Sequence, residues 1–201
     1  MKVNLELCIT NYIIMKTIKI LTLFIMAFTC LAFTKNTTKK VDVEKSVVKW
    51  VGYKLTGQHE GTISIKEGVL NFENNVLTGG TFTIDMGSIN TTDLEGGSKN
   101  RLDEHLKDED FFDVDKYKTA TMVFKEIKPS NKDYLIKADL TIKGITNEIL
   151  FNMSVFETSA TANLKIDRTQ FNITYKSATF TNILKDKAIY DEFDLSVKLS
   201  F

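Results

Sequence analysis

Phe193-Asp194-Leu195-Ser196-Val197-Lys198-Leu199-Ser200-Phe201 (FDLSVKLSF) ends the chain and alternates apolar with polar side chains at every step. Successive side chains of a β-strand point to opposite faces, so this alternation predicts a strand with one apolar face. The same period of two recurs in residues 48–52, 62–66, 81–86, 122–124 and 134–143. Most of the chain is therefore predicted to form strands that bury one face.

Turn-forming residues separate these runs, which predicts that neighbouring strands reverse direction. They occur at Glu67-Gly68, Asn74-Asn75, Gly79-Gly80, 131–133 and Gly144. Glycine and asparagine accept the backbone conformations that tight reversals need. Strands that follow one another are thus expected to pair antiparallel.

Only residues 98–107 show helical spacing, with Leu102 and Leu106 four positions apart. One helix among about eight strands predicts an all-β fold, either a sandwich or a barrel. The strands are long, and closure into a barrel removes the edges that such strands would otherwise expose. We therefore predict an extended antiparallel eight-stranded β-barrel with one short helix.

The N-terminal segment 1–32 has the pattern of a cleaved signal peptide. Basic residues follow Met15 and precede an apolar run of about 14 residues that starts at Ile20, whereas a membrane-spanning helix needs roughly 20. Cys30-Leu31-Ala32 offers a cleavage site after Ala32, and Met15 offers an alternative start. A retained anchor and lipoprotein processing at Cys30 are the alternatives. The pattern predicts a periplasmic or secreted protein.

The rest of the chain is predicted to form a flexible lead-in and one domain. Residues 33–40 are polar and basic without apolar periodicity, whereas residues 41–201 have the size of a single domain with a sizeable core. Both cysteines, Cys8 and Cys30, lie in the leader. The domain therefore has no thiol for a disulfide, a thiolate metal site or a cysteine nucleophile.

The charge balance argues against nucleic acid as a partner. The chain carries 26 basic and 26 acidic residues, and the lysines are scattered among acids. Binding to a phosphate backbone needs a clustered basic excess. No nucleic-acid interaction is expected.

Large apolar side chains of the inward faces would converge inside a barrel. An eight-stranded barrel is wide enough either to be packed solid or to hold one elongated ligand, and the alternation alone leaves both open. The converging aromatic and methionine side chains are Trp50, Phe82, Met86, Met122, Phe124, Phe151, Met153, Phe193 and Phe201.

The order of motifs from Val41 to Phe201 resembles the YceI-like family, which comprises exported lipocalin-like proteins associated with binding polyisoprenoid lipids. Each motif alone is weak, but their order and spacing together are specific. The motifs are SVVKWVG (46–52), TGQHEG (56–61), LTGGTFTIDM (77–86), LDEHLKDEDFFDVDKY (102–117), DLTIKGIT (139–146) and IDRTQF (166–171).

The resemblance implies a lipocalin-like barrel whose apolar tunnel takes the isoprenoid chain of a quinone or polyprenyl phosphate lipid, for carriage, storage or sequestration. Each buried methylene contributes roughly 0.8 kcal/mol, so such a lipid binds without a catalytic group or a cofactor. Membrane contact would be transient, and aromatic rims would allow a homodimer. The expected tunnel residues are Trp50, Ile65, Phe82, Ile84, Met86, Met122, Phe124, Ile136, Leu140, Phe151, Met153, Leu164, Phe193 and Leu195.

Four polar residues are expected at the rim or near a lipid headgroup: His59, His105, Lys143 and Arg168. Arg168 follows Asp167, so the two residues are predicted either to close the rim as an ion pair or to leave the guanidinium for a pyrophosphate. Lys143, next to a glycine, is a weaker candidate of the same kind.

No metal site and no catalytic site are expected. The chain lacks H-x-x-x-H and H-E-x-x-H spacings, and it lacks a G-x-S-x-G elbow. Two rival functional classes stay open beside the lipid carrier. One is a solidly packed structural or stress-response interaction barrel, and the other is an enzyme that acts on a lipid held in the tunnel.

Two departures from the family pattern bear on the backbone. Asn172 stands where the family has a glycine after the Asp-Arg-Thr-x-Phe motif, and asparagine tolerates the left-handed region that a tight turn needs. Ala138 also replaces a glycine, and its methyl group is expected to narrow the tunnel if the ligand approaches the backbone there.

Overall fold

The computed structural model describes residues 15–16, 34–131, 133–180 and 187–201. The predicted signal peptide, 1–32, thus lies almost wholly outside the described residues. The strands are β1 (Asn36–Lys40), β2 (Val47–Lys54), β3 (Gly57–Glu73), β4 (Val76–Thr91), β5 (Thr119–Ser130), β6 (Asp133–Ile142), β7 (Ile145–Val155), β8 (Ser159–Asp167) and β9 (Ile189–Ser200). The helices are α2 (Gly96–Lys107) and the 3₁₀ helix η1 (Arg168–Phe171).

Contacts between Cα atoms divide the chain into residues 1–35 and residues 36–201. The second unit contains every strand. No helix among the described residues has both the length and the apolar character that a membrane crossing requires.

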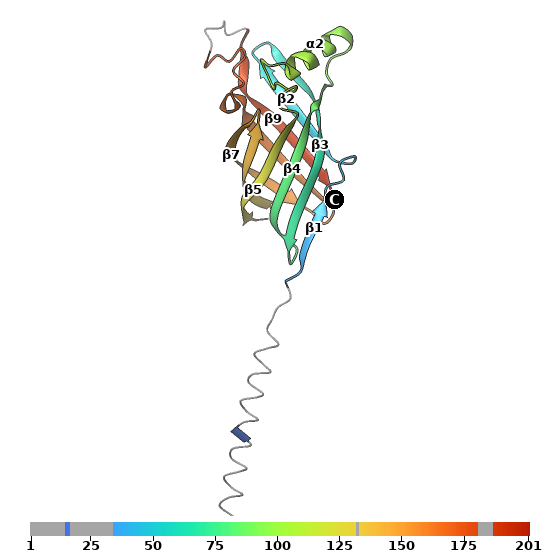
Figure 1. Ribbon diagram of the computed structural model, residues 1–201, viewed down its shortest axis with the longest axis vertical. Coiled ribbons are helices and arrows are strands. Elements are labelled where there is room, and N and C mark those ends of the chain that lie inside the picture. The colour runs from blue at the N-terminus through green and yellow to red at the C-terminus, as the bar shows by residue number, and fades with distance from the viewer. Residues whose placement is uncertain (1–14, 17–33, 132, 181–186) are drawn as a thin grey trace, which may run out of the picture. The chain divides into compact units, whose positions relative to one another are not determined.

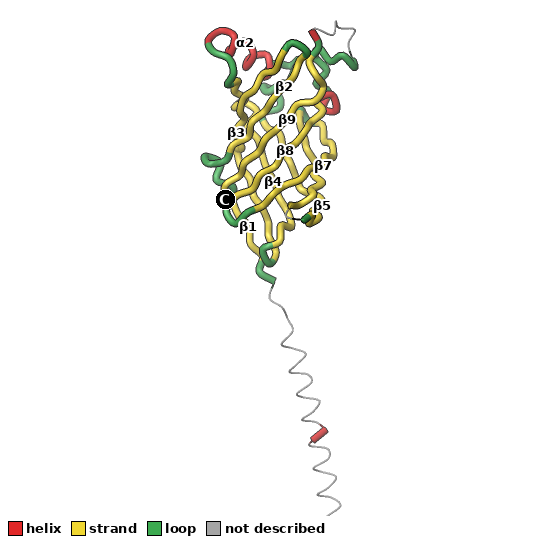
Figure 2. The backbone as a smooth tube through the Cα atoms, turned by 180° about the vertical axis from the view of Figure 1, so that it is seen from behind, coloured by secondary structure: helices red, strands yellow, loops and turns green. Residues whose placement is uncertain are grey.

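The eight strands β2 to β9 form a closed antiparallel barrel, which confirms the predicted fold class (Figures 1 and 2). The order is β3-β2-β9-β8-β7-β6-β5-β4, and β4 pairs back with β3 to close the ring. The α2 helix, close to the predicted range 98–107, lies at the end of the barrel opposite β1. We call these two ends the helix end and the β1 end.

Strand β1 corrects the expectation of a flexible lead-in at residues 33–40. Asn36–Lys40 pairs with Val69–Glu73 of β3. On the same edge of β3, β2 pairs only from Gly57 to Ile63, so β1 covers part of the edge that β2 does not reach. The 17-residue β3 is longer than β2, and a lone β3 edge would be open to foreign strands. The strand can be polar because both of its faces lie near the surface. The sequence therefore shows no apolar periodicity there, and the strand was not predicted.

The inward faces form the core as the alternation predicts. On β8, Ala160, Ala162, Leu164 and Ile166 are buried, while the intervening side chains are exposed. Every adjacent pair of barrel strands is antiparallel, so each strand contributes one such face to the interior.

The seam between β7 and β8 is filled by η1 and the residues after it. In the part of the chain that the structure describes, only Met153–Val155 of β7 pairs with β8. Phe171 and Ile173, 1% and 0% exposed, pack into the core beside this opening, and Asn147 Nδ2 donates to the carbonyl of Gln170 at 2.7 Å. This wedge keeps solvent out of the unpaired part of the seam.

Asn172 ends η1 in the left-handed conformation, with φ 57° and ψ 33°, so asparagine preserves the turn as predicted. The hairpin between β6 and β7 also uses positive φ angles, at Lys143 (53°) and Gly144 (74°). Two such residues give the twist that fits a two-residue hairpin loop.

A side chain at Gly61 would make closer contacts than one at any other glycine of the barrel. A Cβ placed on it lies 2.1 Å from the carbonyl oxygen of Asn90 and 2.5 Å from the Trp50 indole. Main chain and a large ring cannot both move aside, so we expect Gly61→Ala to lower the free energy of unfolding by about 3 kcal/mol. Chemical denaturation measures this loss.

Gly52 supplies the matched control, because a Cβ there meets nothing within 4 Å. Gly52→Ala is expected to change the free energy of unfolding by less than about 1 kcal/mol. Equal stability of the two alanine variants would contradict the close contact at Gly61.

Candidate functional site

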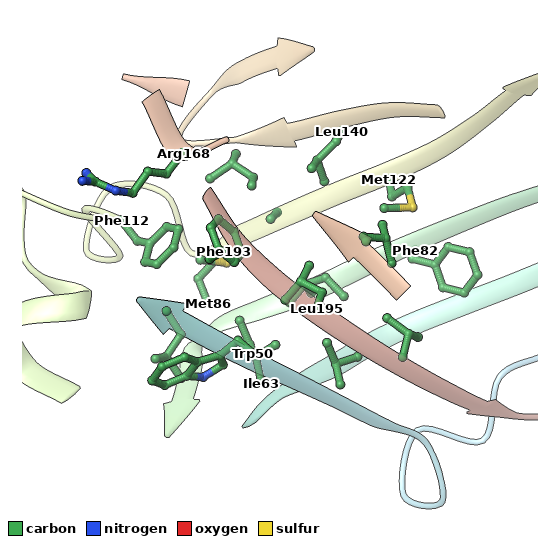
Figure 3. Close-up of a pocket in the computed structure, with 18 of the residues that line it drawn as sticks. Trp50, Ile63, Phe82, Met86, Phe112, Met122, Leu140, Arg168, Phe193 and Leu195 are labelled. Carbon is green, nitrogen blue, oxygen red and sulfur yellow. The ribbon is translucent and has the colours of Figure 1, made fainter. Parts of the chain in front are cut away.

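The barrel contains a cavity of about 190 Å³ that runs from the helix end toward the middle (Figure 3). An apolar cavity of about 150 Å³ already accommodates a benzene molecule. Figure 3 shows Arg168 and Phe112 toward one end of the cavity and Phe82 toward the other. The wall is almost entirely hydrocarbon, with Arg168, Tyr190 and Glu192 at the helix end.

Most of the residues expected in a tunnel lie in the wall of this cavity. They come from all eight strands of the barrel, and each sits on the inward face of its strand. They are Trp50, Ile65, Phe82, Ile84, Met86, Met122, Phe124, Leu140, Phe151, Met153, Leu164, Phe193 and Leu195.

Ile136 is the exception among the expected tunnel residues. It is fully buried, but it lies outside the cavity wall, although it pairs with Phe151, a residue of that wall. Alternation predicts which face of a strand points inward, but not which of the inward side chains the cavity reaches. Ala138, also fully buried, is outside the wall too, so its methyl group does not narrow the cavity.

Three phenylalanine rings lie where the cavity meets the packed β1 end. The ring centroids of Phe82 and Phe124 are 5.5 Å apart, and those of Phe124 and Phe151 are 5.9 Å apart. Such tilted and edge-to-face pairs are favourable arrangements for aromatic rings. We call these three residues the aromatic floor.

The helix end is covered by α2 and the loop that follows it. Leu106, Phe111 and Phe112 from this segment reach into the cavity wall. The sequence reasoning missed them. The available signal was the pair of adjacent phenylalanines within the acidic run Glu109–Asp115. Phenylalanine side chains are usually buried, so such a pair in a charged loop indicates contact with the core.

Polar contacts hold this cover to the barrel. Asp103 of α2 accepts a hydrogen bond from the backbone N–H of Thr91 at 2.8 Å and another from Lys99 Nζ. Lys143 Nζ donates to the carbonyls of Glu109 (2.7 Å) and Phe111 (3.0 Å). Lys143 is therefore a structural tie rather than a residue of the cavity wall.

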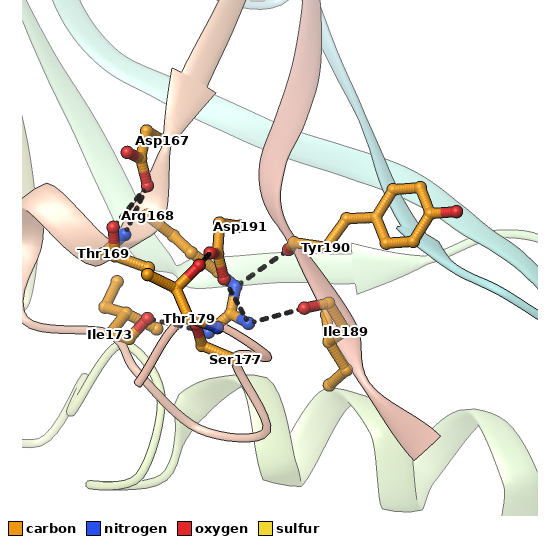
Figure 4. A network of polar contacts seen from close by, with 9 residues as sticks. All are labelled: Asp167, Arg168, Thr169, Ile173, Ser177, Thr179, Ile189, Tyr190 and Asp191. Carbon is orange, nitrogen blue, oxygen red and sulfur yellow. Dashed lines mark hydrogen bonds and ion pairs between the residues drawn. The ribbon is translucent and has the colours of Figure 1, made fainter. Parts of the chain in front are cut away.

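Arg168 is a buried cation, 2% exposed, at the helix end of the cavity (Figure 4). Its Nε donates to the carbonyl of Tyr190 at 3.1 Å, and its Nη1 to that of Ile173 at 2.7 Å. Its Nη2 donates to the carbonyl of Ile189 at 3.0 Å and lies 3.5 Å from Asp191 Oδ1. Burial lowers the pKa of Arg168, and the nearby Asp191 offsets part of that effect.

Asp167 does not form the ion pair with Arg168 that the sequence suggested. Its carboxylate accepts hydrogen bonds from the backbone N–H and the hydroxyl of Thr169, at 2.9 and 2.6 Å, and so caps η1. Burial opposes ionisation of Asp167, but the Thr169 hydrogen bonds outweigh it and lower the pKa of this carboxyl. The rim ion pair is instead Arg168 with Asp191.

The two histidines lie outside the cavity wall. His59 Nδ1 contacts Asp93 Oδ2 at 2.8 Å on a partly exposed edge. The His105 ring packs on Phe111 and Tyr175, with centroid distances of 5.6 and 4.5 Å. Within the described ranges, no three histidine, cysteine or carboxylate side chains are placed to share a metal ion.

Comparisons with known proteins agree on one family. The family model described as "YceI-like domain" matches residues 40–201. Protein YceI of Escherichia coli is 34% identical over 79 residues, which cover 35% of this chain and 41% of that protein. A UPF0312 protein of Staphylococcus aureus is 43% identical over 74 residues, 36% of this chain and 37% of that protein. A UPF0312 protein of Photorhabdus laumondii is 31% identical over 70 residues.

The match therefore spans well under half the length of these relatives. Among solved structures, Burkholderia cenocepacia BcnA superposes with a TM-score of 0.63 at 23% identity, covering 79% of this chain and 98% of that one. The Campylobacter jejuni YCEI protein superposes with a TM-score of 0.53 at 23% identity, covering 67% and 78%. These two likenesses show the shared fold.

Asp103 should make the attachment of α2 sensitive to acid. Burial opposes its ionisation, but hydrogen bonds from Lys99 and Thr91 outweigh burial, so its pKa lies below the ordinary value of 3.8. A lowered carboxyl pKa stabilises the fold at neutral pH, and this contribution is lost as the pH falls through the folded-state pKa. We expect Asp103→Asn to cost about 1–2 kcal/mol at pH 7 and progressively less below about pH 4.

Denaturation curves of the wild type and Asp103→Asn across that pH range measure the difference. The exposed Asp110→Asn on the following loop is the control, and it should leave stability unchanged at every pH. A cost for Asp103→Asn that stayed constant down to the lowest pH at which both proteins fold would contradict the assignment.

Arg168→Met should be strongly destabilising. It removes the donor from three main-chain carbonyls and the cation from Asp191 Oδ1, while Thr179 still donates to Asp191 Oδ2. Removing one partner of a buried charge pair costs about 3–5 kcal/mol, and Arg168→Lys, which keeps the charge but loses the planar fork, should cost less. Unfolding free energies of both variants test this order, and a stable methionine variant would show that the network is dispensable.

Proposed function

We propose that this chain, which belongs to the YceI-like family, holds one polyisoprenoid chain in its barrel cavity and carries, stores or sequesters that lipid. The barrel is of the small ligand-binding kind. The observation that carries the proposal is the elongated cavity, whose wall is hydrocarbon along its length and polar only at the helix end. Such a wall suits an apolar chain with one polar end.

The chemistry of the wall supports a flexible ligand. Met86, Met122 and Met153 contribute unbranched thioether side chains, which adapt to a ligand that bends. Each methylene group moved from water into the wall contributes roughly 0.8 kcal/mol, so a few isoprene units suffice for tight binding. No catalytic group and no cofactor are needed for this role, and we expect none.

The helix end is where a polar headgroup would lie. Arg168 is there, but main-chain carbonyls already engage its Nε and both terminal nitrogens. Glu192 adds a negative charge to the same part of the wall. These groups favour a neutral, quinone-type head over a polyprenyl phosphate.

We further propose that the protein acts outside the cytoplasm, as the N-terminal pattern predicts, and that its contact with membranes is transient. A carrier must collect its lipid from one membrane and leave that membrane again. A homodimer is compatible with this role but is not required by it.

Native mass spectrometry of the protein, purified from an exported compartment without detergent, tests the proposal. We expect a bound mass at one lipid per protein, which organic extraction identifies as an isoprenoid. A protein that stays unliganded after incubation with quinones and polyprenyl phosphates would refute the carrier function and favour an interaction barrel.

Ala162→Leu should weaken lipid binding without adding charge. Ala162 lies in the cavity wall, so a larger apolar side chain there fills space that the lipid needs. We expect occupancy to fall about tenfold, because roughly two methylene groups of the ligand lose their place. Native mass spectrometry after incubation with a quinone measures the change.

Thr161→Leu is the matched control on the same strand, because its side chain points outward and is exposed. It should bind the quinone as the wild type does. Equal occupancy in both leucine variants would place the lipid elsewhere.

A further inference from the structure

The aromatic floor separates two different interiors of the same barrel. Toward the helix end lies the cavity, and toward the β1 end lie buried side chains such as Leu70 and Leu77. Phe124 stands between them. A Cβ on Gly80 would lie 2.6 Å from the Phe124 ring and 3.2 Å from Leu70, so the glycine provides the space that the ring occupies.

The depth of the cavity follows from the strands that line it. On β9 the apolar wall runs from Phe193 to Leu199. The wall on β4 runs from Phe82 to Ile89, but β4 bulges there, because the five steps from Asp85 to Asn90 stand opposite only the two steps from Ser64 to Thr62 of β3. A strand rises about 3.3 Å per residue and tilts about 40° from the axis of such a barrel, so the run on β9 gives a depth of about 15 Å.

An extended hydrocarbon chain advances about 1.25 Å per carbon, from a bond length of about 1.5 Å and an angle of about 111°. The cavity therefore matches about 12 carbons in line. Because an isoprene unit has four main-chain carbons, this corresponds to about three units.

We infer that Phe124 fixes the length of the bound chain, so that the cavity takes about three isoprene units and rejects or leaves exposed the rest of a longer chain. This inference rests on the proposed function and adds a limit to it. The aromatic floor is held by ring contacts on both sides of Phe124 and by packed side chains beneath it. A longer chain must displace those side chains or protrude past Arg168 into water.

A mixture of prenyl alcohols tests the limit. Farnesol, geranylgeraniol and longer homologues up to octaprenol are offered together in phosphatidylcholine vesicles, and native mass spectrometry gives the masses that the protein retains. Wild-type protein should retain farnesol in preference to the longer alcohols. Phe124→Ala should raise the occupancy of the next longer homologue about tenfold relative to wild type, since its chain enters the space of the ring.

Two further variants keep the test decisive. Phe124→Leu should shift the distribution the same way but less, and it carries the test if the alanine variant does not fold. Val123→Ala changes the neighbouring side chain of β5, which is 39% exposed on the outside of the barrel, and should match the wild type. Every protein samples the same vesicles, so the preference of long alcohols for the membrane cancels in the comparison.

The outcomes separate the two claims. Retention of octaprenol by the wild type in proportion to its share of the mixture, or equal distributions in the wild type and in both Phe124 variants, would overturn the length limit and leave lipid binding intact. If the wild type and every variant retain none of the alcohols, nor any quinone, the proposed function itself fails.

Discussion

The pairing of β3 with β4 is the contact on which the rest of the barrel depends. The two strands pair from Gly61 to Glu73 of β3, while the other edge of β3 is covered by β2 and β1. Without this pairing the sheet would keep two long free edges. The pairing also fixes the register of the inward faces, because a slip by one residue would turn every apolar side chain of a strand toward solvent.

The size of the inward side chains explains why one part of the barrel interior is hollow and another part is packed. Gly52, Ala120 and Ala162 face the cavity and leave room there, whereas large side chains such as Leu70 and Phe72 meet at the β1 end. A barrel of eight strands has little spare width, so a few small residues at one level decide whether a cavity exists. The open and the filled barrel that the alternation allowed are both present, one in each half.

Much of this architecture could be predicted from the sequence, because period-two alternation reports directly on strands. Turn residues were a weaker guide, since Glu67-Gly68 lies within β3 and Gly79-Gly80 within β4, where no reversal occurs. Nearly all of the expected tunnel residues do line the cavity, but wall residues such as Ile63, Ile89 and Ala120 were not among those expected. No local pattern encodes which inward side chains the cavity reaches, so Ile136 was wrongly assigned to the tunnel wall. The partner of Arg168 could not be foreseen either, since Asp191 approaches it through the pairing of β8 with β9. Phe111 and Phe112 needed the fold of the loop after α2 to reach the cavity.

The packing of η1 into the seam between β7 and β8 determines where the barrel opens locally. Most barrel strands are tied to both neighbours by ladders of main-chain hydrogen bonds, but the seam between β7 and β8 depends for much of its length on the packing of Phe171 and Ile173. Side-chain packing without a ladder yields at a lower free energy than a paired strand. Amide hydrogens of η1 and of β7 near Ile145 will thus exchange with solvent earlier than those of β3 and β4, and local opening of this molecule begins at its seam.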